Sequence, residues 1–344
     1  MMRLGLIARA DSRGLGVQTK AFHDHLHPTK TMVVNPSSAK PLALHRDWYP
    51  GATWVDGFPT SEDFVSFLED LDVVYTAELP YDYSLFTLAA ERGIRTLLHV
   101  NPEFCDKLAD PTLPDPTLYL APTTWLWDRL PDPKKLLPFP VDTEKFRPAP
   151  PAHTATRFLH VVGRPAIYDR NGTGDFLLAL ENVRSEIEVF IRCQQPGYVH
   201  SLICTYDIHL PDNVHLRFNG KNQENYWDLY GDQDVLVMPR RFAGMSLPMQ
   251  EACAAGLPVI APDISPNNDW LSPEWLVPAR RTGSFTARTE VDVYTVDHIA
   301  LAAMIDRMAT DSGFYQRAAR AALSIADQRS WKTLLPEYLS VLSG

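Results

Sequence analysis

Short apolar runs alternate with amphipathic stretches along most of this chain, and that alternation restricts the fold more than any other feature. Strands that alternate with helices of this length are typical of βαβ units, whose strands lie in a parallel sheet. The first half of the sequence therefore predicts an α/β domain. Its expected strands are 4–10, 31–35, 53–55, 71–76 and 95–100, and its expected helices are 18–26, 61–71 and 83–92.

A proline-rich segment without periodicity, residues 138–151, separates this series from a second one. Such a segment is typical of an interdomain linker. We expect one domain at 1–145, joined by a returning helix at 329–344, and a second domain at 146–328. The second series predicts strands 157–162, 188–192, 214–218, 235–239 and 258–261, helices 174–183, 223–230 and 246–255, and a helical tail over 296–342 that is broken near Arg329.

Composition excludes several classes of protein. The chain has 344 residues with 32 basic and 42 acidic side chains, a net charge of −10, which argues against an extended nucleic-acid interface. No apolar run is long enough to span a membrane, and the N-terminus resembles a first strand more than a signal peptide. The four cysteines are too scattered for a disulfide framework or a zinc site. We therefore expect a cytoplasmic protein.

Residues 235–263 contain the most informative pattern in the sequence. A buried strand ends near Pro239, a loop with Gly244 follows, and a helix begins near Leu247. The N-terminal amides of such a helix form an anion site. Glu251 lies about one turn into the helix, where its carboxylate could accept hydrogen bonds from a ribose diol or could be a solvated surface group.

This stretch resembles the signature of the family 4 retaining glycosyltransferases of the GT-B fold. The resemblance implies two Rossmann-like domains that face a central cleft, with a C-terminal helix that crosses back to the first domain. It also implies transfer of a sugar from a nucleoside diphosphate-sugar to an acceptor hydroxyl, with retention of configuration and without a metal. The residues that agree with the signature are Phe242, Gly244, Leu247, Pro248, Glu251, Ala252, Gly256, Pro258, Val259 and Ile260.

The resemblance also implies roles for single residues. Glu251 would hold the nucleotide ribose, and the backbone amides of Met245 and Ser246 would approach the diphosphate and the sugar. Gly244 and Leu247 complete this donor-binding turn. The family has a second glutamate that faces the donor sugar, and Ala243 stands in its place, which leaves one sugar contact unsupplied.

Residues 158–180 resemble the first strand, loop and helix of the family's nucleotide domain, in which a Gly-Arg pair and a later lysine bind the diphosphate. Gly163 and Arg164 match the pair, and Arg170 is the nearest cation to the missing lysine. We assign Arg164, Arg170 and Asn171 to the donor site, and Arg164 also to catalysis. As alternatives, the arginines are surface cations of a loop and Asn171 begins a turn before a helix. Residues 121–130 and 138–148 also resemble family segments in the expected order.

Gly14 and Gly16 follow the first strand and permit close backbone approach where a helix begins. In the glycosyltransferase interpretation this loop faces the donor phosphates; alternatively, it is a tight strand–helix turn. A dinucleotide-binding fingerprint would need another glycine at Thr19, so a dehydrogenase is disfavoured.

Two further polar residues follow strands of the first domain. Glu78 lies just past the strand 71–76, and His99 lies at the end of the strand 95–100. Because the carboxyl ends of parallel strands line the ligand site, we predict catalytic roles at the acceptor for both. A histidine in an apolar run is equally typical of a buried core.

Two other functions remain open at this point. One is a non-catalytic protein that binds nucleotide-sugars or glycans on the same fold. The other is a glycosyltransferase that acts on a nucleic-acid base, which the acidic charge disfavours. The Asp232-Gln233-Asp234 triplet spells a metal motif of another glycosyltransferase fold, but it precedes a strand, so we interpret it as a turn. The expected partners are a nucleotide-sugar donor and an unidentified hydroxyl acceptor.

Overall fold

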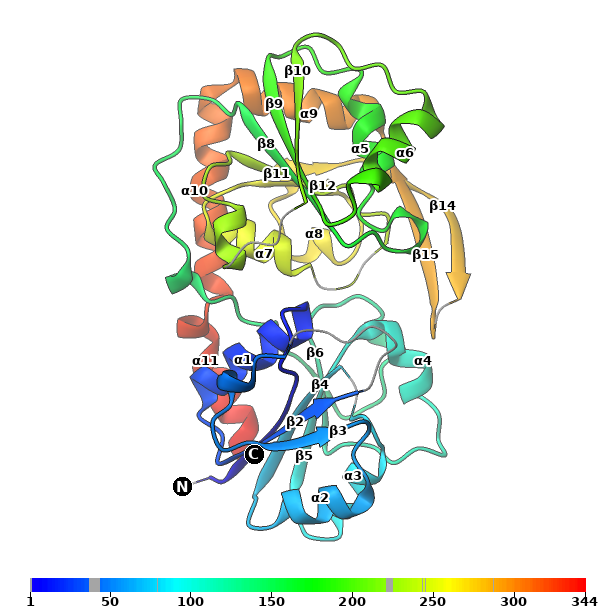
Figure 1. The fold of residues 1–344 in the computed structure, drawn as a ribbon, viewed down its shortest axis with the longest axis vertical. Coiled ribbons are helices and arrows are strands. Elements are labelled where there is room, and N and C mark those ends of the chain that lie inside the picture. The colour runs from blue at the N-terminus through cyan, green and yellow to red at the C-terminus, as the bar shows by residue number, and fades with distance from the viewer. Residues whose placement is uncertain are drawn as a thin grey trace. The chain divides into compact units, whose positions relative to one another are not determined.

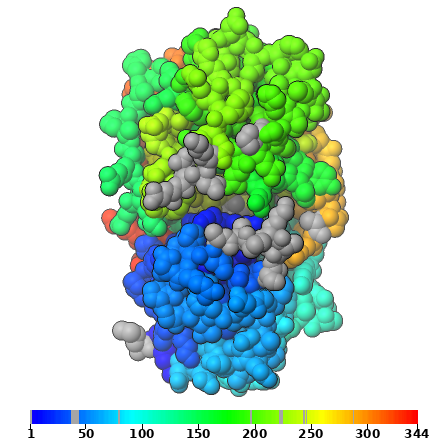
Figure 2. Space-filling model, in the orientation of Figure 1, coloured from blue at the N-terminus to red at the C-terminus, as the bar shows by residue number. Residues whose placement is uncertain are grey.

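The computed structural model divides the chain into two compact units, each built on its own parallel sheet (Figure 1). Unit 1 comprises residues 1–139 and 334–344, and unit 2 comprises residues 140–333. The boundaries expected from the sequence, at 145 and 329, lie a few residues away from these. Figure 2 colours the described residues by their position in the chain. The structure describes residues 2–36, 44–78, 80–220, 225–242, 244, 246–286 and 288–344.

Unit 1 has a seven-stranded sheet in the order β3-β2-β1-β4-β5-β6-β7, and all its strand pairs are parallel. Its first six strands have the order of a dinucleotide-binding sheet, in which the direction of winding reverses between β1 and β4. The strands are β1 (Leu4–Ala8), β2 (Lys30–Asn35), β3 (Thr53–Asp56), β4 (Val73–Glu78), β5 (Arg95–Val100), β6 (Leu118–Ala121) and β7 (Lys134–Leu136).

The helices of unit 1 come from both ends of the chain. Phe22 of α1 packs edge-to-face on Tyr338 near the C-terminus, with ring centres 5.2 Å apart, and the Tyr338 hydroxyl donates to the Pro138 carbonyl at 2.8 Å. The C-terminal part of the last helix therefore belongs to the core of unit 1. The helices are α1 (Gly14–Leu26), α2 (Ser61–Leu68), α3 (Ser84–Ala90), α4 (Cys105–Leu108) and the end of α11 (Trp331–Ser343).

Unit 2 repeats the same topology with a six-stranded parallel sheet in the order β10-β9-β8-β11-β12-β13. Here the winding reverses between β8 and β11. The strands are β8 (Arg157–Gly163), β9 (Ile187–Cys193), β10 (Val214–Asn219), β11 (Val235–Val237), β12 (Val259–Pro262) and β13 (Leu276–Val277). Nearly every residue of β8, β11 and β12 is buried, as helices on both faces of a parallel sheet require.

The helices of unit 2 pack in pairs over this sheet: α7 lies against α10, and α5 lies against α6 and α9. The break expected near Arg329 is confirmed, because α10 ends at Gln328 and α11 begins at Trp331. The helices are α5 (Thr173–Leu180), α6 (Pro196–Tyr206), α7 (Leu247–Ala254), α8 (Asn267–Trp270), α9 (His298–Thr310) and α10 (Ser312–Gln328).

Several elements were not expected from the sequence. They include β6, β7, β13, α4, α6, α8 and an antiparallel hairpin formed by β14 (Ala279–Thr286) and β15 (Glu290–Val296). The helix expected over 223–230 is a single 3-10 turn at Tyr226–Leu229, and the start of that range lies outside the described residues. No helix in the described part of the chain is long and apolar enough to cross a membrane.

Candidate functional site

The point where the winding reverses is the expected ligand site of each unit. In open parallel sheets, ligands bind at the carboxyl ends of the strands at this point, because the loops on either side diverge there. In unit 2 it lies between β8 and β11, so the loops that follow these strands, 164–172 and 238–246, border it. The predicted donor-site residues Arg164, Arg170, Asn171, Gly244 and Ser246 all lie on these two loops.

The two loops touch backbone to backbone. Gly172 has φ +68°, and a Cβ atom on it would lie 1.9 Å from the carbonyl oxygen of Pro239. The amide of Arg241 donates to the carbonyl of Arg170 at 3.0 Å. Only glycine permits both the left-handed conformation and this approach at residue 172.

A buried histidine, His160 of β8, fixes the start of α5 to the sheet. Its Nδ1 lies 2.8 Å from the Val237 carbonyl oxygen and its Nε2 lies 3.0 Å from the Thr173 hydroxyl. A carbonyl oxygen only accepts, so Nδ1 carries the proton and Nε2 accepts from Thr173. Burial lowers the pKa of His160, which keeps the ring neutral. Nothing in the sequence pattern distinguished His160 from its apolar neighbours in β8.

The N-terminus of α5 is occupied by a carboxylate of the protein itself. Asp169 Oδ1 accepts from the Thr173 amide at 3.0 Å and from the Tyr198 hydroxyl at 2.7 Å, and its Oδ2 accepts from the Gly174 amide at 2.7 Å. These bonds satisfy the first amides of the helix. The N-terminus of α5 is therefore not open to a bound phosphate.

The N-terminus of α7 differs from that of α5. Ser246 is its N-cap residue, and the serine side chain makes no capping bond. Ser246 is only 5% exposed, and its hydroxyl has no hydrogen-bond partner among the residues that the structure describes. The first turn of α7 carries no acidic residue. A helix N-terminus with an unsatisfied buried hydroxyl favours an anion from outside.

Glu251 projects from the second turn of α7 into partly buried surroundings. Its Oε2 accepts a hydrogen bond of 2.6 Å from the hydroxyl of Tyr230, which is itself 1% exposed. Burial raises the pKa of Glu251 to about 7, and the Tyr230 hydrogen bond opposes that rise. A carboxylate that is held by one hydroxyl in a poorly solvated place is suited to bind further hydroxyl groups, such as those of a ribose.

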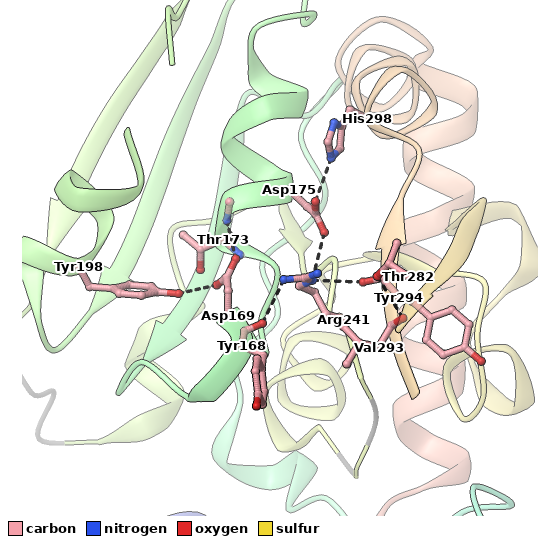
Figure 3. A network of polar contacts seen from close by, with 11 residues as sticks. Tyr168, Asp169, Thr173, Asp175, Tyr198, Arg241, Thr282, Val293, Tyr294 and His298 are labelled. Atoms are coloured by element: carbon pink, nitrogen blue, oxygen red, sulfur yellow. Dashed lines mark hydrogen bonds and ion pairs between the residues drawn. The ribbon is translucent and has the colours of Figure 1, made fainter. Parts of the chain in front are cut away.

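Arg241, directly beside this site, joins four segments of unit 2 (Figure 3). Its Nε donates to the Tyr294 carbonyl on β15 at 3.2 Å, and its Nη1 donates to the Tyr168 carbonyl at 3.2 Å. The same Nε lies 3.8 Å from the carboxylate of Asp175, which also bonds to His298 Nε2 at 2.9 Å. Arg241 therefore ties the loop after β11 to the loop after β8, to α5 and to the hairpin. The sequence did not single out this arginine.

The predicted cations differ in their surroundings. Arg164 is exposed and directly follows Gly163, whose φ of +59° turns the chain at the end of β8. The guanidinium of Arg170 lies 5.3 Å from the centre of the Phe242 ring. Both residues are on the loop that borders the site.

Two other predicted donor-site residues, Asn171 and Gly244, lie on the same two loops. The Asn171 side chain donates to the Val162 carbonyl at 2.9 Å, so it fastens the loop to β8 and acts as a structural residue. Gly244 is buried, and its carbonyl oxygen lies 3.5 Å from Arg240 Nη1. Ala243 and Met245 lie outside the described residues.

The corresponding point of unit 1, between β1 and β4, also gathers polar groups. Arg9 follows β1 and donates to Asp11 at 2.6 Å, and it also donates to the Tyr81 hydroxyl. Glu78 ends β4 with φ +65° and is partly exposed, and its role at the acceptor stays a prediction. Arg9 and Asp11 were not among the predicted residues, although Arg9 visibly interrupts the apolar run of the first strand.

The two glycines of the first loop have a structural explanation. A Cβ atom on Gly16 would lie 1.9 Å from the carbonyl oxygen of Asp11. Gly14 begins α1, whose first turn carries no acidic residue. Gly16 is therefore required by the tight strand–helix turn itself, and a role for Gly14 and Gly16 at the donor phosphates stays a prediction.

The structure contradicts a catalytic role for His99. This residue has no exposed surface, its Nδ1 bonds to the Tyr75 hydroxyl at 2.8 Å, and its ring stacks on Phe139 at 3.9 Å. Burial lowers its pKa to about 3, so the ring stays neutral. His99 is a core residue of unit 1, because β5 is buried on both faces up to its end.

The Asp232–Asp234 turn is structural, as interpreted from the sequence. Asp234 is 5% exposed and accepts from the amides of Thr156 and Arg157 at 2.9 and 2.8 Å. These bonds join the beginnings of β8 and β11, at the end of the sheet opposite to the candidate site.

Comparisons with known proteins agree with this geometry. Residues 157–291, which contain both loops and α7, match the family model described as glycosyl transferases group 1. None of the curated protein sequences matches the chain.

Solved structures match the chain over almost its full length. Sucrose-phosphate synthase from Thermosynechococcus elongatus is 14% identical with a TM-score of 0.68, and the match covers 99% of this chain and 98% of that one. HepE from Anabaena, solved with UDP and glucose, is 12% identical with a TM-score of 0.70 over 100% of both chains. A glycosyltransferase from Rickettsia africae is 13% identical with a TM-score of 0.66, covering 99% and 97%.

These structures confirm the predicted fold class, two Rossmann-like domains of the GT-B type. The family match supports sugar transfer as the general activity. The chain therefore has the fold of the GT-B glycosyltransferases, and its residues 157–291 match the model of the group 1 glycosyl transferases.

Proposed function

We propose that this protein transfers a sugar from a UDP-sugar to the hydroxyl group of an acceptor, with retention of configuration. The observation that supports this most is the pairing, on one helix, of an open N-terminus at Ser246 with the poorly solvated carboxylate of Glu251. The first suits a diphosphate and the second suits a ribose. The structural relative HepE was solved with UDP and with UDP-glucose, which makes uridine the first base to test.

In the proposed reaction, the bond between the sugar C1 and the diphosphate oxygen breaks, C1 forms a bond to the acceptor oxygen on the same face, and the acceptor hydroxyl gives its proton to a base. The negative charge that develops on the diphosphate is stabilised by the amides at the start of α7 and by Arg164 and Arg170. Helix amides and arginines would replace a metal in this role. Glu78 of unit 1 is the candidate base or sugar-hydroxyl ligand on the acceptor side.

Nucleotide binding tests the proposal directly. Thermal unfolding of the protein with UDP, GDP, ADP, CDP or dTDP should show a rise in Tm with UDP, because a ligand at 100 times its Kd adds roughly 2.7 kcal/mol of stability. Stabilisation by none of the five would contradict the proposal. Stabilisation by UDP, with no turnover of a UDP-sugar on any acceptor, would instead favour a binding protein on this fold.

Arg164→Ala is expected to lower the affinity for UDP by about tenfold, because one charge-assisted hydrogen bond to the diphosphate is lost. Arg164 is exposed, so the free energy of unfolding without ligand should stay within about 0.5 kcal/mol of the wild type. Arg320→Ala, on the exposed side of α10, is the matched control and should bind UDP normally. Titration calorimetry measures all three proteins. Equal affinities would remove Arg164 from the donor site.

A further inference from the structure

The loop after β8 contains two consecutive residues in the left-handed region of backbone conformation. Tyr168 has φ +54° and ψ +29°, and Asp169 has φ +49°. For residues with a Cβ atom this conformation costs roughly 1–2 kcal/mol each. Such strain persists only where the surrounding structure enforces it, and it concentrates at ligand sites.

The surroundings enforce it here through the network in Figure 3. Arg241 donates to the Tyr168 carbonyl at 3.2 Å, and the Asp169 carboxylate accepts from Thr173, Gly174 and Tyr198. All of these bonds involve the backbone of Tyr168 or the neighbouring residue. None of them uses the Tyr168 ring.

The ring itself is left at the surface. Tyr168 is 59% exposed. Its ring packs against Phe285 of β14, with centres 4.7 Å apart, and Phe285 in turn packs edge-to-face on Phe242 at 5.0 Å. The hairpin therefore supports the ring of Tyr168 from one side, while most of its surface stays open.

We propose that the open ring of Tyr168 stacks on the sugar of the donor. This rests on the proposed function, because Tyr168 lies between Arg164 and Arg170 on the loop assigned to the diphosphate, and the donor sugar is bonded to that diphosphate. The C–H face of a pyranose is apolar and flat enough to lie on an aromatic ring. Tyr168 is then a specificity residue for the sugar, and Phe285 and Arg241 are positioning residues.

The test compares the affinity for UDP with the affinities for UDP-glucose, UDP-galactose and UDP-glucuronic acid. Tyr168→Gly removes the ring and also relieves the left-handed strain, so this variant should unfold at the wild-type Tm or higher. Tyr168→Phe keeps the ring. Tyr206→Ala, which removes another exposed tyrosine of unit 2, is the matched control.

We expect Tyr168→Gly to weaken binding of the preferred UDP-sugar about tenfold and to leave UDP binding unchanged. Tyr168→Phe and Tyr206→Ala should bind both ligands as the wild type does. The proposal is overturned if Tyr168→Gly binds UDP-sugar normally, if it loses UDP equally, or if the wild type binds UDP as tightly as every UDP-sugar. Failure of the wild type to bind UDP at all would instead overturn the proposed function.

Discussion

Replacing Glu251 with glutamine is expected to stabilise the protein at pH 8 and, at the same time, to weaken its binding of UDP-glucose by about 10–100-fold. The loss of affinity follows from the proposed role, because hydrogen bonds from ribose hydroxyls to a carboxylate are charge-assisted and are worth about 1.5–3 kcal/mol. The gain in stability follows from the burial of the carboxylate.

The direction of the pH effect follows from the two pKa values of Glu251. Burial raises its pKa from 4.5 in the unfolded chain to about 7 in the folded protein. Below pH 4.5 the group is protonated in both the folded and the unfolded state, so its burial does not lower the free energy of unfolding. Above pH 7 it is ionised in both, and the folded state bears a penalty of about 3 kcal/mol. Stability of the wild type should therefore fall as pH rises from 4.5 to 7, and Glu251→Gln should lack that fall.

Urea unfolding at pH 5 and pH 8 measures the stability difference, and titration calorimetry with UDP-glucose measures the affinity. UDP-glucose is the better probe because, unlike UDP, it has no terminal phosphate that titrates near pH 6. Glu274→Gln, at an exposed glutamate of the same unit, should change neither quantity. If Glu251→Gln gained stability but bound UDP-glucose normally, Glu251 would be a buried carboxylate without a role at the ribose.

Gly172→Ala is expected to destabilise the protein by about 3 kcal/mol and to abolish measurable binding of UDP. The substitution adds the left-handed penalty of about 1 kcal/mol and places a methyl group 1.9 Å from the Pro239 carbonyl oxygen. Because the backbone of residue 172 fixes the Cβ position and the other atom is a backbone oxygen, only a separation of the loops after β8 and β11 can relieve the overlap. That separation would displace Arg164, Arg170 and Ser246 from one another.

Gly93→Ala provides a closely matched control. Gly93 has the same φ of +68°, and nothing lies within 4 Å of the Cβ position. Gly93→Ala should therefore lower the free energy of unfolding only by the penalty for the left-handed conformation, about 1 kcal/mol. It should leave UDP binding intact. Urea unfolding and calorimetry of the two variants separate the conformational cost from the close approach. Equal destabilisation by both variants would show that the contact between the two loops contributes nothing to stability.

The sequence predicted the architecture well, because parallel sheets give continuous apolar runs that are easy to recognise. The strands of both sheets that are buried on both faces were placed within a few residues. The hairpin β14–β15 was not anticipated, although β15 alternates exposed residues with buried valines; β14 has no buried residue and is rich in arginine and threonine. The short strands β6 and β7 were missed because three or four residues give no periodicity.

The site was predicted less completely, and for a different reason. A sequence shows which residues follow a strand but not which way their side chains turn. His99 and Asn171 both lie where ligands bind in such sheets, yet one is sealed in the core and the other bonds to the backbone of β8. Arg241 and His160 act through partners that are far away in the chain, so no local pattern marks them.

A crystal structure of the protein with bound UDP tests the central claim most directly. The account predicts that the ribose hydroxyls of UDP lie within hydrogen-bond distance of the Glu251 carboxylate. It also predicts that the diphosphate lies at the N-terminus of α7, beside the Ser246 hydroxyl and Arg164. UDP bound in unit 1, or in unit 2 away from the loops after β8 and β11, would contradict it.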